Sequence, residues 1–328
     1  MFKYIVKRLL IMIPLLLLLS VMVFVIIQLP PGDFLTTYIS KLQSTGMAVN
    51  DEYVEALKVR YGLDKPMYVQ YFKWFGQLLQ GNMGYSFVHN RSVNALIGAR
   101  LATTVTLSIV SLLCIWIVAF PMGFYSATHK YSLADNTFTA VSFFGVSVPE
   151  FLLAIGIMYV YFQATGKYAG GLFSDDFANA PWSLAKFGDM LNHVWIPLLV
   201  IVITGTAGLF KTFRANLLDE LSKPYVKTAR AKGVPYLKLL IKYPVRIALI
   251  PFISTVGWLF PQLISGQTIL SMVLNLPTIG PLLITSLKNQ DMFLAGSIVF
   301  IMGLMAMIGN LVSDILLALT DPRIRNSM

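Results

Sequence analysis

The feature that most constrains this chain is a series of apolar runs, each long enough to cross a lipid bilayer. A helix rises about 1.5 Å per residue and the hydrocarbon core is about 30 Å thick, so a spanning helix needs about 20 mostly apolar residues. Six spans are predicted, at Leu9 to Leu29, Leu101 to Ala127, Phe138 to Phe162, Val194 to Phe213, Ile247 to Leu270 and Phe293 to Leu319. Backbone polar groups in lipid must be bonded within each segment, so all six are expected to be helical. The predicted fold class is an all-α polytopic membrane protein.

The composition supports this prediction. Of the 328 residues only 12% are charged and 56% are hydrophobic, whereas a soluble domain carries about 25% charged residues. A soluble enzyme and a disordered protein are therefore excluded. The single Cys114 excludes a disulfide scaffold and a cysteine-ligated metal site.

The net charge of +10 is explained by topology, and no nucleic-acid partner is expected. Lys and Arg are concentrated between Lys211 and Arg246, whereas the connection from Gln163 to His193 holds only Lys167 and Lys186. Basic residues favour the cytoplasmic side, which predicts that the N- and C-termini are both cytoplasmic. The first span is expected to be a retained helix, because its apolar run is longer than the core of a cleaved signal.

These spans divide the chain into three parts. Residues 1–29 form an N-terminal segment with the first span, and residues 30–100 form an extracytoplasmic loop subdomain. Residues 101–328 form the core transmembrane domain, with a cytoplasmic loop at residues 211–246.

Sequence motifs for chemistry are missing. No phosphate-binding loop of the form G-x-x-x-x-G-K-[ST] and no H-E-x-x-H pair occurs, and His89, His129 and His193 are isolated in loops. We therefore expect no catalytic, cofactor-binding or metal-binding residues in this chain.

The cytoplasmic loop contains a short predicted helix that ends at Gly233, with Lys227, Arg230 and Lys232 near its end. One interpretation is a basic amphipathic stretch on anionic headgroups. The other is a helix whose small residues, Ala229 and Ala231, give it a low-profile face that packs into another protein's groove. Composition alone favours neither interpretation.

The segment from Tyr225 to Gly233, followed by Arg246 to Pro251, resembles the coupling-helix signature of the permease subunits of ATP-binding-cassette importers of the oligopeptide and dipeptide type. The general importer signature begins Glu-Ala-Ala; Lys227, Thr228 and Ala229 at those positions resemble the form usual in the oligopeptide branch. Shorter matches to the same family lie at Leu29 to Asp33, Tyr61 to Pro66, Gly84 to Phe87, Leu276 to Gly280 and Asp321 to Arg325.

The resemblance implies the type I importer permease fold in a prokaryotic inner or plasma membrane. Its implied partners are a second homologous permease, two cytoplasmic ATPases that bind ATP and Mg²⁺, and an extracytoplasmic solute-binding protein that delivers a short peptide or an oligosaccharide. The chain itself would be a non-catalytic subunit forming half of the pathway. The implied ATPase-coupling residues are Tyr225, Thr228, Ala229, Arg230, Ala231 and Gly233.

Polar residues within the spans are candidates for the translocation path. Glu150 follows Pro149 in the third span, where an isolated carboxylate is costly. It either faces a water-filled path or forms a structural bond with a neighbouring helix. Trp258, Gln262 and Gln267 in the fifth span line the path or join helices by hydrogen bonds.

Two other function classes compete with an importer subunit. An autonomous proton-coupled secondary transporter would use Glu150 as its proton site, but no internal repeat is evident. An intramembrane enzyme would need catalytic groups at matching depths, and no histidine lies within a predicted span.

Overall fold

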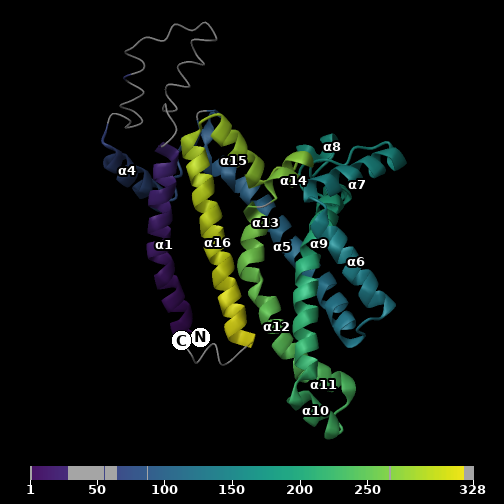
Figure 1. Ribbon diagram of the computed structural model, residues 1–328. Coiled ribbons are helices and arrows are strands. Elements are labelled where there is room, and N and C mark those ends of the chain that lie inside the picture. The colour runs from purple at the N-terminus through teal and green to yellow at the C-terminus, as the bar shows by residue number, and fades with distance from the viewer. Residues whose placement is uncertain (1, 29–54, 56–64, 87, 266, 321–328) are drawn as a thin grey trace. The chain divides into compact units, whose positions relative to one another are not determined.

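The computed structural model describes residues 2–28, 55, 65–86, 88–265 and 267–320 of the chain, and most of these are helical (Figure 1). Two short strands, β1 (Tyr85–Ser86) and β2 (Arg91–Ser92), form an antiparallel hairpin with Tyr85 opposite Ser92. The described chain packs as two compact units.

The larger unit comprises residues 1–6, 104–277 and 306–328. Its complete helices are α6 (Leu133–Ser147), α7 (Glu150–Thr165), α8 (Asp175–Ala178), α9 (Leu184–Ser222), α10 (Pro224–Ala231), α11 (Tyr236–Lys242), α12 (Pro244–Ser254), α13 (Val256–Ser265) and α14 (Thr268–Val273). The second unit comprises residues 7–103 and 278–305 and contains α4 (Met67–Leu79), the hairpin and α15 (Ile279–Lys288). Helices α1 (Phe2–Gln28), α5 (Val93–Thr128) and α16 (Met292–Thr320) have residues in both.

Within the described residues, five helical segments are long and apolar enough to cross a membrane. They are Ile5–Ile26, Val93–Thr128, Leu184–Ser222, Tyr236–Val273 and Phe293–Thr320. A sixth span exists if α6 and α7, which are bent by 104° relative to each other, are one broken span. The prediction of an all-α polytopic fold is confirmed.

The prediction that the third span is one helix from Phe138 to Phe162 is wrong. Helix α6 ends at Ser147, and Val148 is extended with φ −98° and ψ 123°. Pro149 explains this break, because its ring disfavours helical geometry at the preceding residue and it has no N–H to donate. Glu150 is consequently the first residue of α7 instead of lying inside a helix.

The fourth predicted span is also longer in the structure. Helix α9 extends from Leu184 to Ser222, well beyond the predicted Val194 to Phe213. It begins where the Ser183 hydroxyl accepts a hydrogen bond from the Lys186 backbone N–H at 3.2 Å, which satisfies one free donor of the first turn. The loops on both sides of this span are therefore shorter in the structure than predicted.

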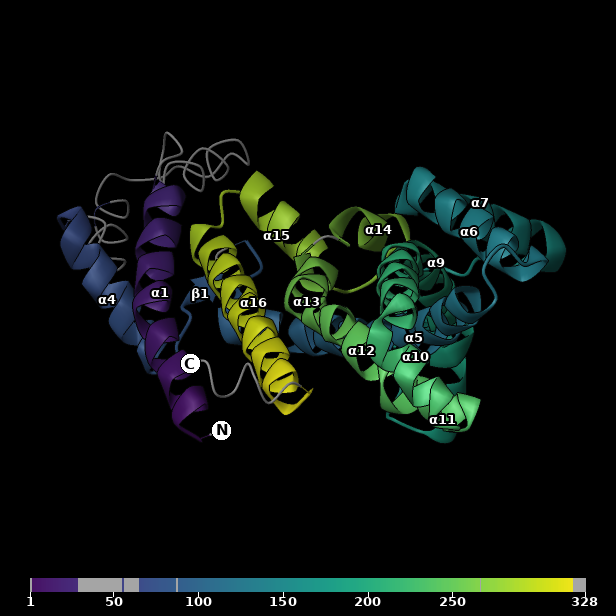
Figure 2. The same ribbon diagram turned by 60° about the horizontal axis from the view of Figure 1, so that its bottom comes forward.

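Helix α9 lies at the centre of the larger unit, with α12 along one side and α6 along the other (Figures 1 and 2). Its fully buried side chains include Ile196, Ile201, Phe210, Phe213 and Leu217. Phe213 packs at 5.0 Å from Phe120 of α5 and at 5.5 Å from Phe252 of α12, measured between ring centroids. These contacts place the hydrophobic core of the unit around α9.

The second unit has a core of its own. Val93 and Ile97 of α5 pack with Leu282 of α15 and with Leu294 and Ile298 of α16. A second cluster joins α1 to α4 through aromatic contacts, which include Phe24 and Tyr71 at 5.5 Å between ring centroids.

A buried carboxylate attaches the hairpin to this second unit. The Ser86 hydroxyl donates a hydrogen bond to Asp291, which is 1% exposed and precedes α16. Burial raises the pKa of Asp291, and the bond from Ser86 opposes that shift.

The contact between α6 and α9 yields a stability prediction. A Cβ added at Gly145 of α6 would lie 2.7 Å from the carbonyl oxygen of Ile203 in α9, whereas one added at Gly156 of α7 would meet nothing within 4 Å. We expect Gly145→Ala to lower the free energy of unfolding by about 1–3 kcal/mol through overpacking. Thermal unfolding of the detergent-solubilised chain measures this, with Gly156→Ala as the matched control. Equal unfolding temperatures for the two variants would contradict the packing described here.

Candidate coupling site and translocation path

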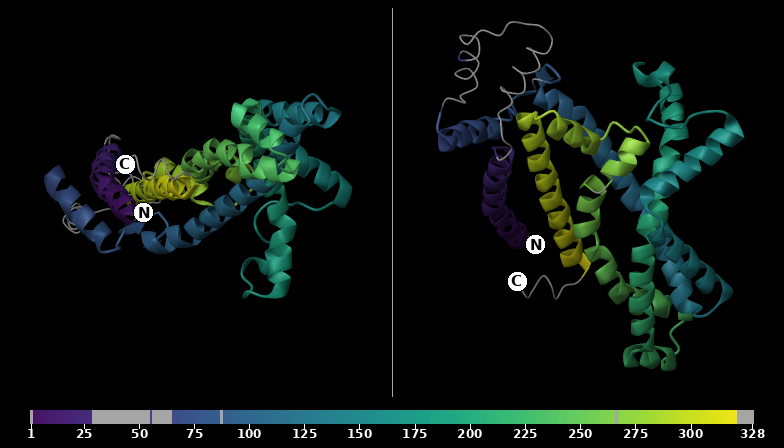
Figure 3. Two further views of the ribbon diagram at one scale, coloured as in Figure 1. Left: turned by 90° about the horizontal axis from the view of Figure 1, so that it is seen from below. Right: turned by 45° about the horizontal axis from the view of Figure 1, so that its top comes forward.

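Helices α10 and α11 form a small elbow that follows the C-terminal end of α9. Figure 3 shows the elbow beyond that end of α9, on the side where α5 turns into α6. Lys223 is extended (φ −67°, ψ 149°) and separates α9 from α10. Pro224 occupies the first position of α10, where its missing N–H has no cost. The predicted short helix in this loop is confirmed.

Gly233 ends this helix as predicted. Its φ is +72°, a left-handed conformation that residues with a Cβ rarely adopt. The backbone N–H of Gly233 donates to the Arg230 carbonyl at 3.0 Å, and that of Val234 donates to the Ala229 carbonyl at 3.3 Å. The chain thereby reverses into α11.

The predicted outward-facing role of Ala229 does not agree with the structure. Ala229 is 8% exposed and packs with Val226 of α10 and with Leu239 and Leu240 of α11. Leu221 of α9 packs against the same cluster, as does Phe124 of α5. The small side chain at position 229 therefore permits close packing within the elbow, not against another protein.

The other predicted coupling residues are accessible to different extents. Thr228, Arg230, Ala231 and Gly233 are exposed, and Tyr225 is half-buried. The Tyr225 hydroxyl donates to Glu220, and burial together with this carboxylate raises the pKa of Tyr225. The exposed surface of α10 thus combines small residues with basic ones.

Helix α11 has an exposed apolar face that was not predicted from the sequence. Tyr236, Leu237 and Ile241 are exposed by 53%, 62% and 58%. The four-residue spacing of Leu237 and Ile241 could have indicated it, since residues four apart share one face of a helix.

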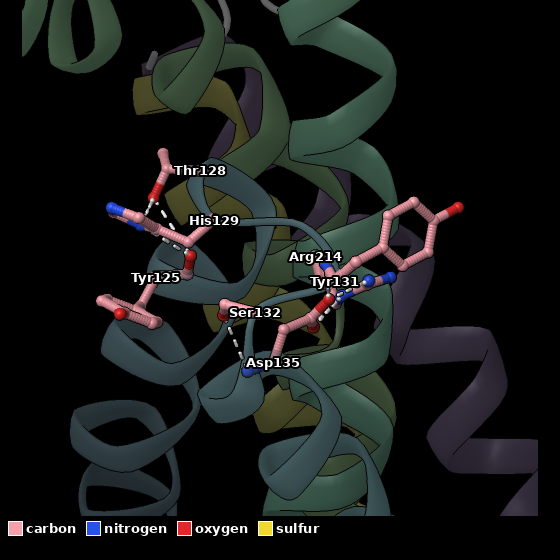
Figure 4. Close-up of polar contacts among 7 residues, drawn as sticks. All are labelled: Tyr125, Thr128, His129, Tyr131, Ser132, Asp135 and Arg214. Atoms are coloured by element: carbon pink, nitrogen blue, oxygen red, sulfur yellow. Dashed lines mark hydrogen bonds and ion pairs between the residues drawn. The ribbon is translucent and has the colours of Figure 1, made fainter.

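An ion pair between α6 and α9 was also not predicted from the sequence (Figure 4). The Arg214 guanidinium of α9 donates to both oxygens of Asp135 in α6, from Nε to Oδ1 and from Nη2 to Oδ2, each at 2.7 Å. The Tyr131 backbone N–H donates to Asp135 Oδ2 at 2.9 Å. The Asp135 carboxylate is therefore bound from both the turn and the neighbouring helix.

Glu150 lies at the bend between α6 and α7 and is bonded to α9. Its Oε1 accepts a hydrogen bond from the Thr204 hydroxyl at 3.0 Å. This distance shows an interhelical bond, and the half-buried side chain remains partly accessible.

The three candidates of the fifth span separate into two environments. Trp258 (55% exposed) and Gln262 lie four residues apart on one exposed face of α13, together with Ser265. Gln267 is 8% exposed and precedes α14. The structure thus brings Trp258 and Gln262 together and buries Gln267.

The polar face of α13 differs from the exposed face of α5. The large exposed residues Ile109, Leu113 and Ile117 of α5 are apolar, as expected of a surface in contact with lipid. A face that presents an indole, an amide and a hydroxyl is suited instead to water or to another protein. Among the described residues, no group of three or more His, Cys, Asp or Glu side chains could hold a metal ion.

The fold defines a polytopic helical membrane protein with an exposed helical elbow, and the comparisons with known proteins name its family. Residues 119–326 match the binding-protein-dependent transport system inner membrane component, and residues 1–109 match the N-terminal region of such membrane components. The chain therefore belongs to this family.

Relatives match over nearly the whole chain. It is 34% identical to the oligopeptide transport system permease protein AppB of Bacillus subtilis, over 99% of each chain. It is 33% identical to a putative peptide permease protein of Brucella ovis and 30% identical to the glutathione transport system permease protein GsiC of Escherichia coli K12, again over 99% of each chain.

These matches establish the general function. The protein is a non-catalytic permease subunit of an ATP-binding-cassette importer, a multi-pass protein of the plasma membrane. ATP hydrolysis takes place in partner subunits, and a solute-binding protein supplies the solute. Neither the fold nor the relatives support an autonomous proton-coupled transporter.

The positive φ of Gly233 yields a prediction about the elbow. A Cβ at this position meets nothing within 4 Å, so any loss comes from backbone strain and not from a clash inside the chain. We expect Gly233→Val to destabilise the elbow by about 1 kcal/mol or more, and Gly233→Asn to do so less, because Asn tolerates this conformation. Hydrogen exchange of the α10 and α11 amides measures the difference. Equal protection in both variants and the parent chain would refute the strain.

Proposed function

We propose that this chain forms half of a path for short peptides, paired with a second homologous permease and coupled to two ATPase subunits that bind ATP and Mg²⁺. The named relatives support a peptide as the substrate. Two are described as oligopeptide or peptide permeases, and the third is a permease of a glutathione transport system; glutathione is itself a short peptide. An oligosaccharide has no such support.

The observation that carries the coupling proposal is the exposed α10 helix at the end of α9. Thr228, Arg230 and Ala231 are accessible there, while Val226 and Ala229 anchor the helix to α11. An anchored helix with an accessible face can move as one body with the helix that carries it. We propose that this face contacts an ATPase subunit in the cytoplasm.

The proposed orientation has both termini in the cytoplasm. The α5–α6 turn contains Lys130, and the elbow region contains most of the Lys and Arg residues predicted to be cytoplasmic. The Asp135–Arg214 pair joins the start of α6 to the last part of α9. The common placement of these basic segments at one end of the unit supports the positive-inside assignment.

We further propose that Trp258 and Gln262 line the path and that Glu150 faces it from the bend. An aromatic ring and an amide can contact a peptide backbone, and a carboxylate can bind its charged amino terminus. Gln267 is buried and is therefore left out of the proposed path.

The function can be tested by reconstitution. The purified chain in liposomes should show neither ATPase activity nor uptake, because its sequence has no phosphate-binding loop. With its partner subunits and binding protein, it should import a labelled tri- or tetrapeptide when ATP is present. Uptake driven by a proton gradient in the chain alone would overturn the proposal, and competition by an oligosaccharide but not by peptides would overturn the substrate class.

The role of Glu150 can be separated from that of its hydrogen bond. Glu150→Gln removes the charge but keeps an oxygen that can accept from Thr204, whereas Thr204→Val removes the bond and keeps the charge. A hydrogen bond to a charged group contributes about 1.5–3 kcal/mol. Weakening the bond between the Glu150 carboxylate and the peptide's amino terminus should therefore lower peptide uptake by about tenfold in Glu150→Gln. Assembly and basal ATPase rates should remain near those of the parent complex. If only Thr204→Val impairs uptake and assembly, the role of Glu150 is structural, through its hydrogen bond with Thr204.

A further inference from the structure

The Asp135–Arg214 pair joins the start of α6 to the last part of α9. Asp135 belongs to the first turn of α6 and is 1% exposed, and Arg214 is in α9 with a side chain 23% exposed. Figure 4 shows the two side chains meeting between the helices. The Ser132 hydroxyl caps α6 by accepting from the Asp135 backbone N–H at 3.2 Å.

The turn that presents Asp135 adopts an unusual backbone conformation. Tyr131 has φ +63°, which is uncommon for a residue with a side chain. This conformation directs its N–H toward Asp135 Oδ2 at 2.9 Å. On the preceding turn, the ring of His129 stacks on Tyr125 at 4.4 Å between centroids. The turn is thus held in one geometry by several contacts.

Close packing on both sides connects this pair to the elbow. A Cβ at Gly123 of α5 would lie 2.8 Å from the Phe213 ring and 3.5 Å from the Arg214 backbone nitrogen, so α5 and α9 are in close contact here. Phe124, the next residue of α5, packs against the cluster that joins α10 to α11. The elbow, the end of α9 and the α5–α6 turn therefore form one packed body.

The bidentate bond between Asp135 and Arg214 fixes the relative position of two helices more strictly than a non-directional apolar contact would. A bidentate arginine–carboxylate bond has strict directional requirements, which a leucine pair of equal volume would not have. A shift of α9 along α6 would break both bonds and leave a buried charge uncompensated, which is strongly unfavourable. The pair thus fixes the register between the two helices.

We propose that Asp135 and Arg214 are a positioning pair that transmits the movement of the α10–α11 elbow, through α9, to α6 and its bend at Glu150. This rests on the proposed docking of α10 on an ATPase subunit. When the ATPases displace the elbow, α9 moves with it, and the bidentate bond makes α6 follow. Without the bond, α9 can shift relative to the start of α6, so less of the elbow's displacement reaches the bend, where the Thr204–Glu150 hydrogen bond still joins α9 to α7.

The test compares Asp135→Asn and Arg214→Lys with Asp219→Asn in the complete reconstituted complex. Asp219→Asn is the matched control, because it removes an exposed ion pair with Lys223 (2.9 Å) close to the elbow. The measurements are retained ATPase subunits, ATP hydrolysis and peptide imported per ATP hydrolysed. Allosteric couplings of about 1–3 kcal/mol correspond to factors of about 5–150.

We expect Asp135→Asn and Arg214→Lys to retain the ATPases and their hydrolysis while peptide imported per ATP falls about fivefold or more. Arg214→Lys keeps the positive charge but loses the planar guanidinium that binds both carboxylate oxygens. A fall in peptide imported per ATP in this variant therefore shows that the geometry of the bond matters. The control should remain within about twofold of the parent complex.

A purely structural role would lower assembly and unfolding temperature in both variants and leave the import per ATP unchanged in the complexes that assemble; that result would overturn the proposal. A fourth variant, Ala231→Trp on the exposed face of α10, distinguishes failure of the underlying docking proposal. If Ala231→Trp retains full coupling, docking at α10 is wrong. If it loses the ATPases while Asp135→Asn couples normally, only the transmission is wrong.

Discussion

The close packing of α9 against α6 and α12 is the interaction on which the larger unit depends. Gly145 lets α6 approach the backbone of α9 at Ile203, and the ring of Phe213 fills the space between α5 and α12. Because protein interiors are tightly packed, such helices move as solid elements and do not deform individually.

The same helix carries the polar contacts of functional interest. Thr204 bonds to Glu150 at the bend, Arg214 bonds to Asp135 at the turn, and Leu221 packs against the elbow. The candidate path and the candidate ATPase contact are thus attached to one continuous piece of secondary structure. From Thr204 to Leu221 these contacts lie on uninterrupted helix, which gives the proposed coupling a direct physical route.

The sequence predicts the spans well, because their signal is local. Apolar runs of sufficient length identify the helices, and Gly233 identifies the end of α10 from a conformational preference of one residue type. The break at Pro149 is the exception: the run from Phe138 to Phe162 is mostly apolar, so hydropathy predicts one span where the structure has two helices at 104°.

The errors at the site have a different physical origin. A small residue such as Ala229 indicates that something packs closely against it, but its partner, Leu239 or an ATPase, is determined by tertiary structure. Asp135 and Arg214 are 79 residues apart in the sequence, and one sequence contains no signal that joins them. Local patterns identify elements, whereas contacts between distant residues require the fold.

The length of α9 has a mechanical consequence. Its 39 residues extend about 58 Å at about 1.5 Å per residue, while the hydrocarbon core is about 30 Å thick. The excess is shared between the two ends of the helix, about nine to ten residues on each side of the predicted span from Val194 to Phe213, and the elbow follows the C-terminal end. A helix that tilts about a point inside the bilayer displaces its far end more than its middle, so a given movement of the elbow corresponds to a smaller one among the packed spans.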